Sequence, residues 1–91
     1  MTKILYSGKF KKDLKRYQNR HRQIAALGTV LKHLKREGYV PAEYFPHKLH
    51  GIYEGCLECH IESDFLLIWI DENREIIKLL RVGTHHELFG I

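Results

Sequence analysis

The hydrophobic pattern of this chain changes its period once, near Val40, and this change limits the fold more than any other feature of the sequence. Before Val40, apolar residues recur every three or four positions, as on one face of a helix. After it, they alternate with polar residues or form a short continuous run, as in strands. The order predicts an α+β domain in which two N-terminal helices pack on a small, mainly antiparallel sheet.

Two helices are predicted in the first half of the chain. The first begins after Ser7, whose hydroxyl can accept hydrogen bonds from the free N–H groups of the first turn. The second covers residues 22–36 and ends at Gly38, because glycine most readily takes the left-handed conformation that follows a helix. Their buried stripes are expected to contain Phe10, Leu14 and Tyr17 in the first helix, and Ile24, Leu27, Leu31 and Leu34 in the second.

Two segments of the second half have the pattern of neighbouring strands. Residues 57–61 alternate in polarity, which indicates a half-buried strand with a polar face turned outward. The outward face is expected to contain Cys56, Glu58 and His60. Residues 65–70 are apolar without interruption, which is typical of a central strand buried on both faces.

The remaining strands complete the predicted sheet. Residues 75–82 form the last strand after a hairpin connection at residues 71–74, and residues 4–6 form a short first strand that can make the sheet mixed. Pro41 and Pro46 exclude a helix between the two halves, so this part is expected to be an extended connection.

A short terminal helix is expected after Gly83, since Thr84 and Glu87 have the spacing of a capping box. The first turn of such a helix presents free N–H groups and the positive end of a dipole, which suit a phosphate group. His85 occupies this turn, so we expect it to lie beside a bound phosphate.

The chain is expected to form one domain covering residues 1–91. Its longest apolar run is far shorter than the ~20 residues that span a bilayer, and its first residues lack the layout of a signal peptide. We therefore expect a cytoplasmic protein with no membrane association. Its two cysteines are too few for a disulfide framework and are expected to be thiols.

Basic residues gather in the first half of the chain. Residues 1–50 contain twelve Lys and Arg against three acidic residues, whereas residues 51–91 contain three against eight. Most of the basic residues fall on the outer faces of the two predicted helices. Such a surface suits nucleic acid, but a solvated helix has the same pattern, so charge alone does not decide between the two.

Histidines are the second unusual feature, with seven in 91 residues. Histidine exchanges protons near neutral pH because its ordinary pKa is about 6.5. Metal-free RNA cleavage needs one group to remove the proton of the 2′-hydroxyl, another to protonate the leaving 5′-oxygen, and a cation to offset transition-state charge. We expect His60, His85 and Arg81 to converge at one edge of the sheet and to meet these needs.

A zinc site is the alternative chemistry for this region. Cys56, Cys59 and His60 have a spacing that occurs in zinc sites, and His47 and His85 could complete the ligands. However, a strand would place the two cysteines on opposite faces of the sheet, and no second pair of cysteines follows. The sequence therefore favours chemistry without a metal or another cofactor.

Four segments, in this order, resemble the YafQ branch of the RelE toxin superfamily, and together they cover essentially the whole chain. They are residues 6–13, 46–51, 58–68 and 81–90. The last three contain the motifs His-x-Leu-x-Gly, His-Ile-x-x-Asp and Gly-Thr-His-x-x-Leu-Phe. The combination is fairly specific, although each motif alone would be weak.

The resemblance implies an mRNA interferase that acts on the translating ribosome without a metal. The catalytic residues that it implies are His47, His60, Asp64, Arg81 and His85. The histidines and Asp64 would share acid–base and orienting roles, and Arg81 would stabilise phosphate charge. Phe89, the C-terminal aromatic residue, and Lys48 are expected to bind RNA.

The resemblance also implies partners: a cognate antitoxin similar to DinJ or RelB, the ribosome and mRNA. Toxin and antitoxin of such systems often form a 2:2 complex, and operator DNA is contacted only through the antitoxin.

Two positions depart from the family, which commonly has arginine where this chain has Leu57 and proline where it has Ser63. Leu57 motivates an alternative function, a catalytically weak RNA- or antitoxin-binding module that acts in operon repression.

Overall fold

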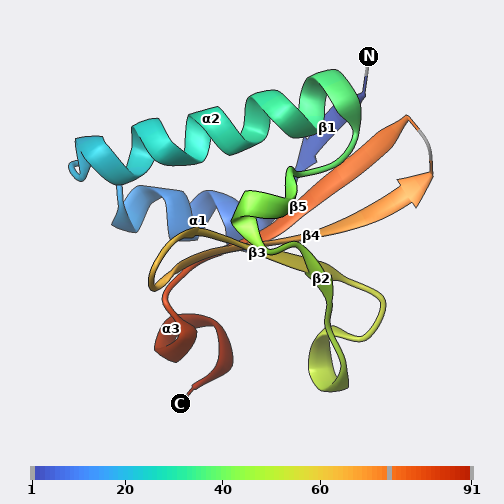
Figure 1. Ribbon diagram of the computed structural model, residues 1–91. Coiled ribbons are helices and arrows are strands. Elements are labelled where there is room, and N and C mark those ends of the chain that lie inside the picture. The colour runs from blue at the N-terminus through green and yellow to red at the C-terminus, as the bar shows by residue number, and fades with distance from the viewer. Residues whose placement is uncertain (1, 74, 91) are drawn as a thin grey trace.

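The computed structural model describes residues 2–73 and 75–90, and it places two helices on one face of a five-stranded sheet (Figure 1). The helices are α1 (Gly8–Arg16), α2 (His21–Glu37) and α3 (His85–Phe89). The strands are β1 (Lys3–Tyr6), β2 (His47–Lys48), β3 (Leu57–Glu62), β4 (Phe65–Asn73) and β5 (Ile76–Gly83). The strand order is β1-β5-β4-β3-β2, with β1 parallel to β5 and the other pairs antiparallel. The predicted α+β fold, including the mixed sheet, is confirmed.

Strand β4 is the centre of the molecule because apolar layers cover both of its faces. Phe65, Leu67 and Trp69 belong to the cluster that also contains the buried residues of α1 and α2. Leu66 and Ile68 belong to a second cluster on the opposite face, which includes Leu88 of α3. The continuous apolar run is therefore a strand buried on both sides, as predicted.

Local signals set the ends of the helices. Ser7 Oγ accepts from the N–H of Phe10 at 3.0 Å and caps α1. Gly38 ends α2 with a φ of +79°, a left-handed conformation that favours glycine, and its N–H donates to Leu34 O at 2.9 Å. Both ends were predicted. The predicted stripe of α2 lies on the core, but Ile24 and Leu31 are only half-buried there, and the fully buried Val30 was not predicted.

The connection between the helices and the hairpins is more structured than predicted. Instead of running extended, it contains the single 3₁₀ turns η1 (Ala42–Tyr44) and η2 (Gly51–Tyr53), with β2 between them. Elements of two or three residues are too short to show a hydrophobic period, so the sequence does not reveal them. The expected hairpin connection at residues 71–74 is also wrong in part, because β4 continues to Asn73; Arg74 lies outside the described residues.

The prediction that strand β3 turns a polar face to solvent is wrong at two of its three positions. Cys56 and Glu58 are buried, and only His60 is half-buried. The reason is the second apolar cluster, in which α3 and the segment around Tyr53 cover this face.

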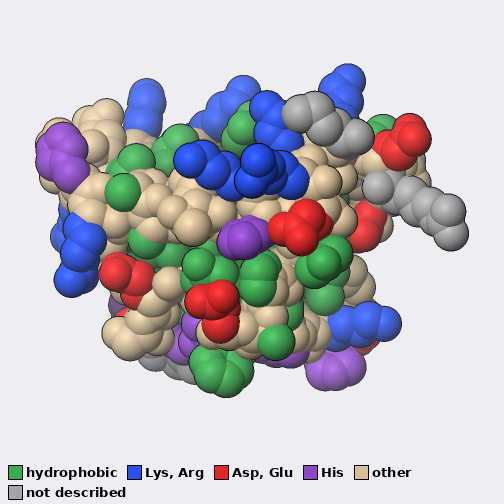
Figure 2. Space-filling view, turned by 45° about the horizontal axis from the view of Figure 1, so that its top comes forward, with side chains coloured by type: hydrophobic (Ala, Val, Ile, Leu, Met, Phe, Trp, Pro, Cys, Tyr) green, Lys and Arg blue, Asp and Glu red, His purple; other side chains and the backbone are tan. Residues whose placement is uncertain are grey.

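The surface over α2 is basic. Figure 2 shows Lys and Arg side chains gathered on this face, as predicted for the outer faces of the helices, and Lys32, Lys35 and Arg36 of α2 are exposed. Within residues 2–73 and 75–90, no helix combines the length and the apolar character that a membrane span requires.

Candidate active site

Three histidines from separate elements meet at one place on the molecule. His47 comes from β2, His60 from β3 and His85 from the start of α3. The ring centroids of His47 and His60 are 6.0 Å apart, and those of His60 and His85 are 6.1 Å apart. The predicted convergence of His60 and His85 is present, and His47 joins them.

The register of the sheet brings these residues together. His60 pairs with Leu66 of β4, and Leu66 pairs with Gly83 at the end of β5. His85 follows Gly83 by two residues, so it returns to the neighbourhood of His60 as soon as α3 begins. On the other side of β3, β2 pairs with the first two residues of the strand and adds His47.

The start of α3 is fixed by the predicted capping box. Thr84 Oγ1 accepts from the N–H of Glu87 at 3.2 Å, and Glu87 Oε1 accepts from the N–H of Thr84 at 2.9 Å. Glu87 also accepts from the hydroxyl of Tyr17, and its Oε2 lies 3.3 Å from Arg16. Burial opposes ionisation of Glu87, but the bonds from Tyr17 and Thr84 and the charge of Arg16 hold its pKa below its ordinary value.

Gly83 leaves the room that this arrangement requires. Its φ is +155°, and a Cβ at this position would lie 2.5 Å from Glu87 Oε1. Any side chain here would therefore collide with the carboxylate that caps α3.

Asp64 orients His85. Asp64 Oδ1 accepts from the backbone N–H of His85 at 3.0 Å and lies 2.8 Å from its Nδ1. The backbone and side-chain hydrogen bonds from His85 lower the pKa of Asp64, so at neutral pH it is a carboxylate and can only accept. Nδ1 of His85 must therefore carry a hydrogen, which leaves Nε2 of the neutral ring free to accept a proton.

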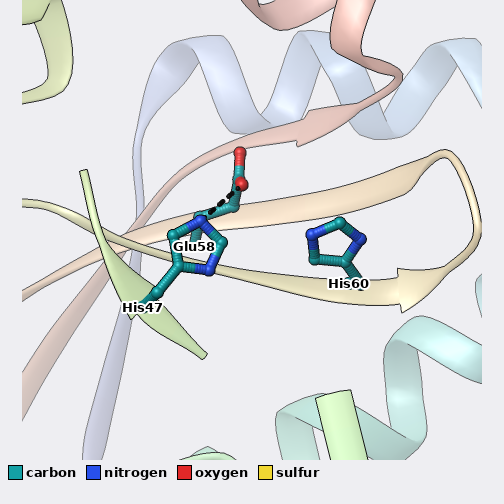
Figure 3. Close-up of side chains that lie close together, drawn as sticks. All are labelled: His47, Glu58 and His60. Carbon is teal, nitrogen blue, oxygen red and sulfur yellow. Dashed lines mark ion pairs between the residues drawn. The ribbon is translucent and has the colours of Figure 1, made fainter. Parts of the chain in front are cut away.

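Glu58 is a residue of the site that the sequence reasoning missed. It is 3% exposed, and its Oε1 lies 3.1 Å from Nε2 of His47 (Figure 3). Nδ1 of His47 lies 2.8 Å from the carbonyl oxygen of Phe45, which can only accept. A neutral imidazole has one N–H and cannot donate to both partners. A proton is therefore shared between His47 and Glu58, carried by a cationic imidazole or by a neutral carboxyl group.

The same residues form a possible metal site. One donor atom from each of His47, Glu58 and His60 lies within 4.8 Å of the others (Figure 3). Oε2 of Glu58 is buried and has no hydrogen-bond partner among the described residues. Two imidazoles and a carboxylate suit a divalent transition metal such as Zn²⁺ or Cu²⁺.

The cysteines play no part in this cluster. Cys59 lies in the helix-side apolar cluster and Cys56 in the cluster on the opposite face, as expected for a strand. Burial raises the pKa of Cys56, and it raises that of Cys59 to about 12. Because the two thiols lie in clusters on opposite faces of the sheet, they cannot bind one metal ion together.

Arg81 lies beside the histidine cluster rather than within it. Its Nε and Nη2 donate to the two oxygens of Asp13, at 2.7 and 3.1 Å, and its Nη1 donates to the hydroxyl of Tyr53 at 3.4 Å. The bond to Asp13 raises the pKa of Arg81, so the guanidinium keeps its charge.

Asp13 is 2% exposed and also accepts from the N–H of Val82. It lies three residues after Phe10 on the buried stripe of α1, and this helical spacing is the signal in the sequence that indicates its burial.

Phe89 links the histidines to Arg81. Its ring centroid lies 6.1 Å from that of His85 and 5.4 Å from that of Tyr53, which accepts from Arg81. Lys48 is exposed and follows His47 in β2. A series of contacts thus runs from His47 to Arg81 through His60, His85, Phe89 and Tyr53, and Tyr53 was not among the predicted site residues.

Comparisons with known proteins agree with these observations. A family model described as "Bacterial toxin of type II toxin-antitoxin system, YafQ" matches residues 2–90. The mRNA interferase toxin YafQ of Escherichia coli K12 is 35% identical over 88 residues, which cover 96% of this chain and 95% of the relative. YafQ in the crystal structure of the E. coli DinJ–YafQ complex superposes with a TM-score of 0.85 at 34% identity, covering 99% of this chain and 100% of that chain. A metal-bound toxin from Helicobacter pylori has a TM-score of 0.84 at 34% identity, covering 98% of this chain and 100% of that chain.

Proposed function

The chain belongs to the YafQ family of bacterial toxins of type II toxin–antitoxin systems, and from this premise we propose that it is an mRNA interferase, an endoribonuclease that cuts messenger RNA. The observation that carries the proposal is the contact between His47, His60 and His85, with Asp64 and Glu58 bonded to the two outer rings. These groups can supply and remove protons on both sides of a phosphate.

His85 is the general base of the proposed reaction. Asp64 holds its Nδ1, so Nε2 is free to take the proton of a 2′-hydroxyl. The 2′-oxygen then forms a bond to the adjacent phosphorus. The negative charge of Asp64 stabilises the imidazolium that results.

His47 is the general acid. The proton that it shares with Glu58 passes to the 5′-oxygen as the bond between this oxygen and phosphorus breaks. The products are a 2′,3′-cyclic phosphate and a 5′-hydroxyl. His60 lies between the other two rings and is placed to contact the phosphate. The proposed reaction uses no metal.

Arg81 supplies the positive charge that offsets the pentavalent transition state. Asp13 holds it in position through two hydrogen bonds. Phe89, which contacts His85, offers a ring on which a base can stack, and the exposed Lys48 beside His47 can bind a neighbouring phosphate.

The partners follow from the relatives. The E. coli YafQ chain was crystallised with DinJ, and we expect this protein to bind a similar antitoxin, in a 2:2 complex that contacts operator DNA only through the antitoxin. The substrate is mRNA on translating ribosomes in the cytoplasm.

The alternative, a catalytically weak binding module, was motivated by Leu57. The side chain of Leu57 packs against the helix-side apolar cluster, whereas the histidines lie on the other side of β3. An arginine missing from this position removes nothing from the histidine cluster, and the enzyme is therefore the better interpretation.

The test is primer extension on a reporter mRNA after brief induction of the wild type, His85→Ala and His21→Ala. His21 is exposed at the start of α2 and serves as the matched control. New cuts within translated codons are expected for the wild type and His21→Ala, and none for His85→Ala. Folded wild-type protein that leaves the mRNA intact would contradict the proposal.

A further inference from the structure

A groove lies beside Arg81, where α1 approaches the end of β5. It consists of two hollows that share the side chains of Lys9 and Arg81. The larger, of about 430 Å³, is lined by Ser7, Gly8, Lys9, Tyr53, Leu80 and Arg81. The smaller, of about 250 Å³, is lined by Lys9, Lys12, Asp13, Arg16 and Arg81.

The larger hollow has the chemistry of a nucleobase site. Leu80 and the ring of Tyr53 are its apolar walls, and the guanidinium of Arg81 lies at its side. Bases stack on aromatic rings and on the guanidinium plane of arginine. A base can enter such a hollow only from a single strand, because a base within a duplex is already stacked and paired.

The smaller hollow has the chemistry of a phosphate site. Lys9, Lys12 and Arg16 are exposed. Neither lysine has an ion-pair partner among the described residues, while Arg16 lies 3.3 Å from Glu87. Asp13 is fully buried and both of its oxygens are bonded, so its carboxylate does not oppose an anion at the surface. Arg81 is paired with Asp13 and Arg16 with Glu87, so Lys9 and Lys12 are the basic groups that remain to bind phosphates.

The lining of the groove is linked to the candidate active site through Tyr53, whose ring contacts Phe89, which in turn contacts His85. We propose that the groove binds the RNA strand next to the scissile phosphate, with one base on Tyr53 in the larger hollow and backbone phosphates on Lys9 and Lys12. This inference rests on the proposed function and names a substrate-binding surface for it. An acidic peptide would match the lysines but would make no use of the apolar hollow between Tyr53 and Leu80.

The first experiment measures binding of a fluorescent 2′-O-methyl RNA octanucleotide, which lacks the free 2′-hydroxyl and cannot be cut. Lys9→Ala/Lys12→Ala is compared with Lys32→Ala/Lys35→Ala, which removes the same charge from exposed positions of α2. The groove variant is expected to bind about tenfold more weakly, and the slope of log K against log salt is expected to fall by about 1.4, since each phosphate contact contributes about 0.7 for single strands. Equal losses in the two variants would overturn the phosphate site.

The second experiment tests the base site with Tyr53→Leu and Tyr53→Phe. The phenylalanine variant keeps the ring, and it is expected to bind the octanucleotide as the wild type does. Loss of the ring in Tyr53→Leu is expected to weaken binding about tenfold, the lower part of the range for one stacked base. Equal binding by Tyr53→Leu and Tyr53→Phe, with both variants folded by circular dichroism, would contradict the base site.

A cleavage assay with ribosomes separates this inference from the proposed function. The groove predicts a raised KM and an unchanged kcat for Lys9→Ala/Lys12→Ala. If the wild type binds the octanucleotide through the groove but cuts no mRNA, the proposed function fails and the binding surface remains. If the wild type cuts mRNA and the groove variant equals its control in both assays, the binding surface alone is refuted.

Discussion

The hydroxyl of Tyr17, at the C-terminal end of α1, donates a hydrogen bond to the carboxylate of Glu87 in α3, 70 residues later in the chain. Glu87 is also the residue that caps α3. The position of the helix that begins with His85 therefore depends on a residue in the first helix. This contact explains how a terminal helix of five residues can hold His85 in place.

Tyr17→Phe is expected to lower the free energy of unfolding by about 1 kcal/mol, the usual contribution of one hydrogen bond. Burial, the hydrogen bond to Glu87 and the charge of Glu87 raise the pKa of Tyr17 to about 12. A raised pKa favours the protonated form, so the contribution is present below about pH 10 and is lost as the pH rises through about 12. Urea denaturation should show the wild type and the variant converging over that range. Tyr6→Phe, at a half-exposed tyrosine, is the control and should change little.

Asp64→Asn is expected to reduce kcat about 100-fold and to leave KM within about twofold, because asparagine can still accept from His85 but cannot stabilise an imidazolium by charge. The pKa of Asp64 is lowered, so its charge is present above the ordinary carboxyl range and lost only as the pH falls below it. Neutral-pH activity should therefore be insensitive to its titration. Cleavage on translating ribosomes measures both constants. Asp71→Asn, at an exposed aspartate, should match the wild type, and a full-rate Asp64→Asn variant would refute the orienting role.

Asp13→Ala is expected to destabilise the fold by about 3 kcal/mol, since it leaves a largely buried guanidinium without its partner. It also leaves the N–H of Val82 without the acceptor that it has now. Thermal and urea denaturation measure the loss. The double variant Asp13→Leu/Arg81→Leu removes both charges and should recover part of the lost free energy of unfolding. A loss below about 0.5 kcal/mol, as is usual for surface substitutions, would show that the pair is not structural.

Zn²⁺ is expected to inhibit cleavage, because a metal held by His47, Glu58 and His60 would occupy the atoms of His47 and Glu58 that share a proton in the proposed reaction. Calorimetry should show one zinc site, with an affinity at least tenfold lower in Glu58→Gln and unchanged in His50→Ala. His50 is exposed and lies 3.6 Å from Glu54, outside the cluster. A zinc-selective chelator should restore activity. Inhibition that persists in Glu58→Gln would place the inhibitory ion elsewhere.

Much of the fold could be predicted because its signals are local. Ser7, Gly38 and the pair Thr84 and Glu87 cap helices through contacts within a few residues, and β4 is recognisable from its own apolar run. The meeting of His60 and His85 could be predicted because β3 and β5 both pair with β4, which brings His60 on β3 close to the end of β5, just before His85.

The parts that escaped prediction depend on distant segments. Glu58 is buried because α3 and the segment around Tyr53 cover its face of β3, and neither element has a clear period. Asp13 follows two lysines, a context typical of a solvated helix, and its partner Arg81 lies 68 residues away. Strand β2 has only two residues and exists through its pairing with β3.

Substitution of Gly83 is expected to inactivate the toxin while the rest of its fold is kept. A side chain there meets the carboxylate of Glu87, so even alanine must shift the carboxylate that caps α3, and we expect this shift to loosen the start of the helix, where His85 lies. Bacteria that survive induction of this gene without antitoxin are expected to include substitutions at this codon. Such alleles would encode a protein that still occupies the antitoxin while sparing the mRNA, and they would shift the balance between the two partners in a cell that also carries the active gene.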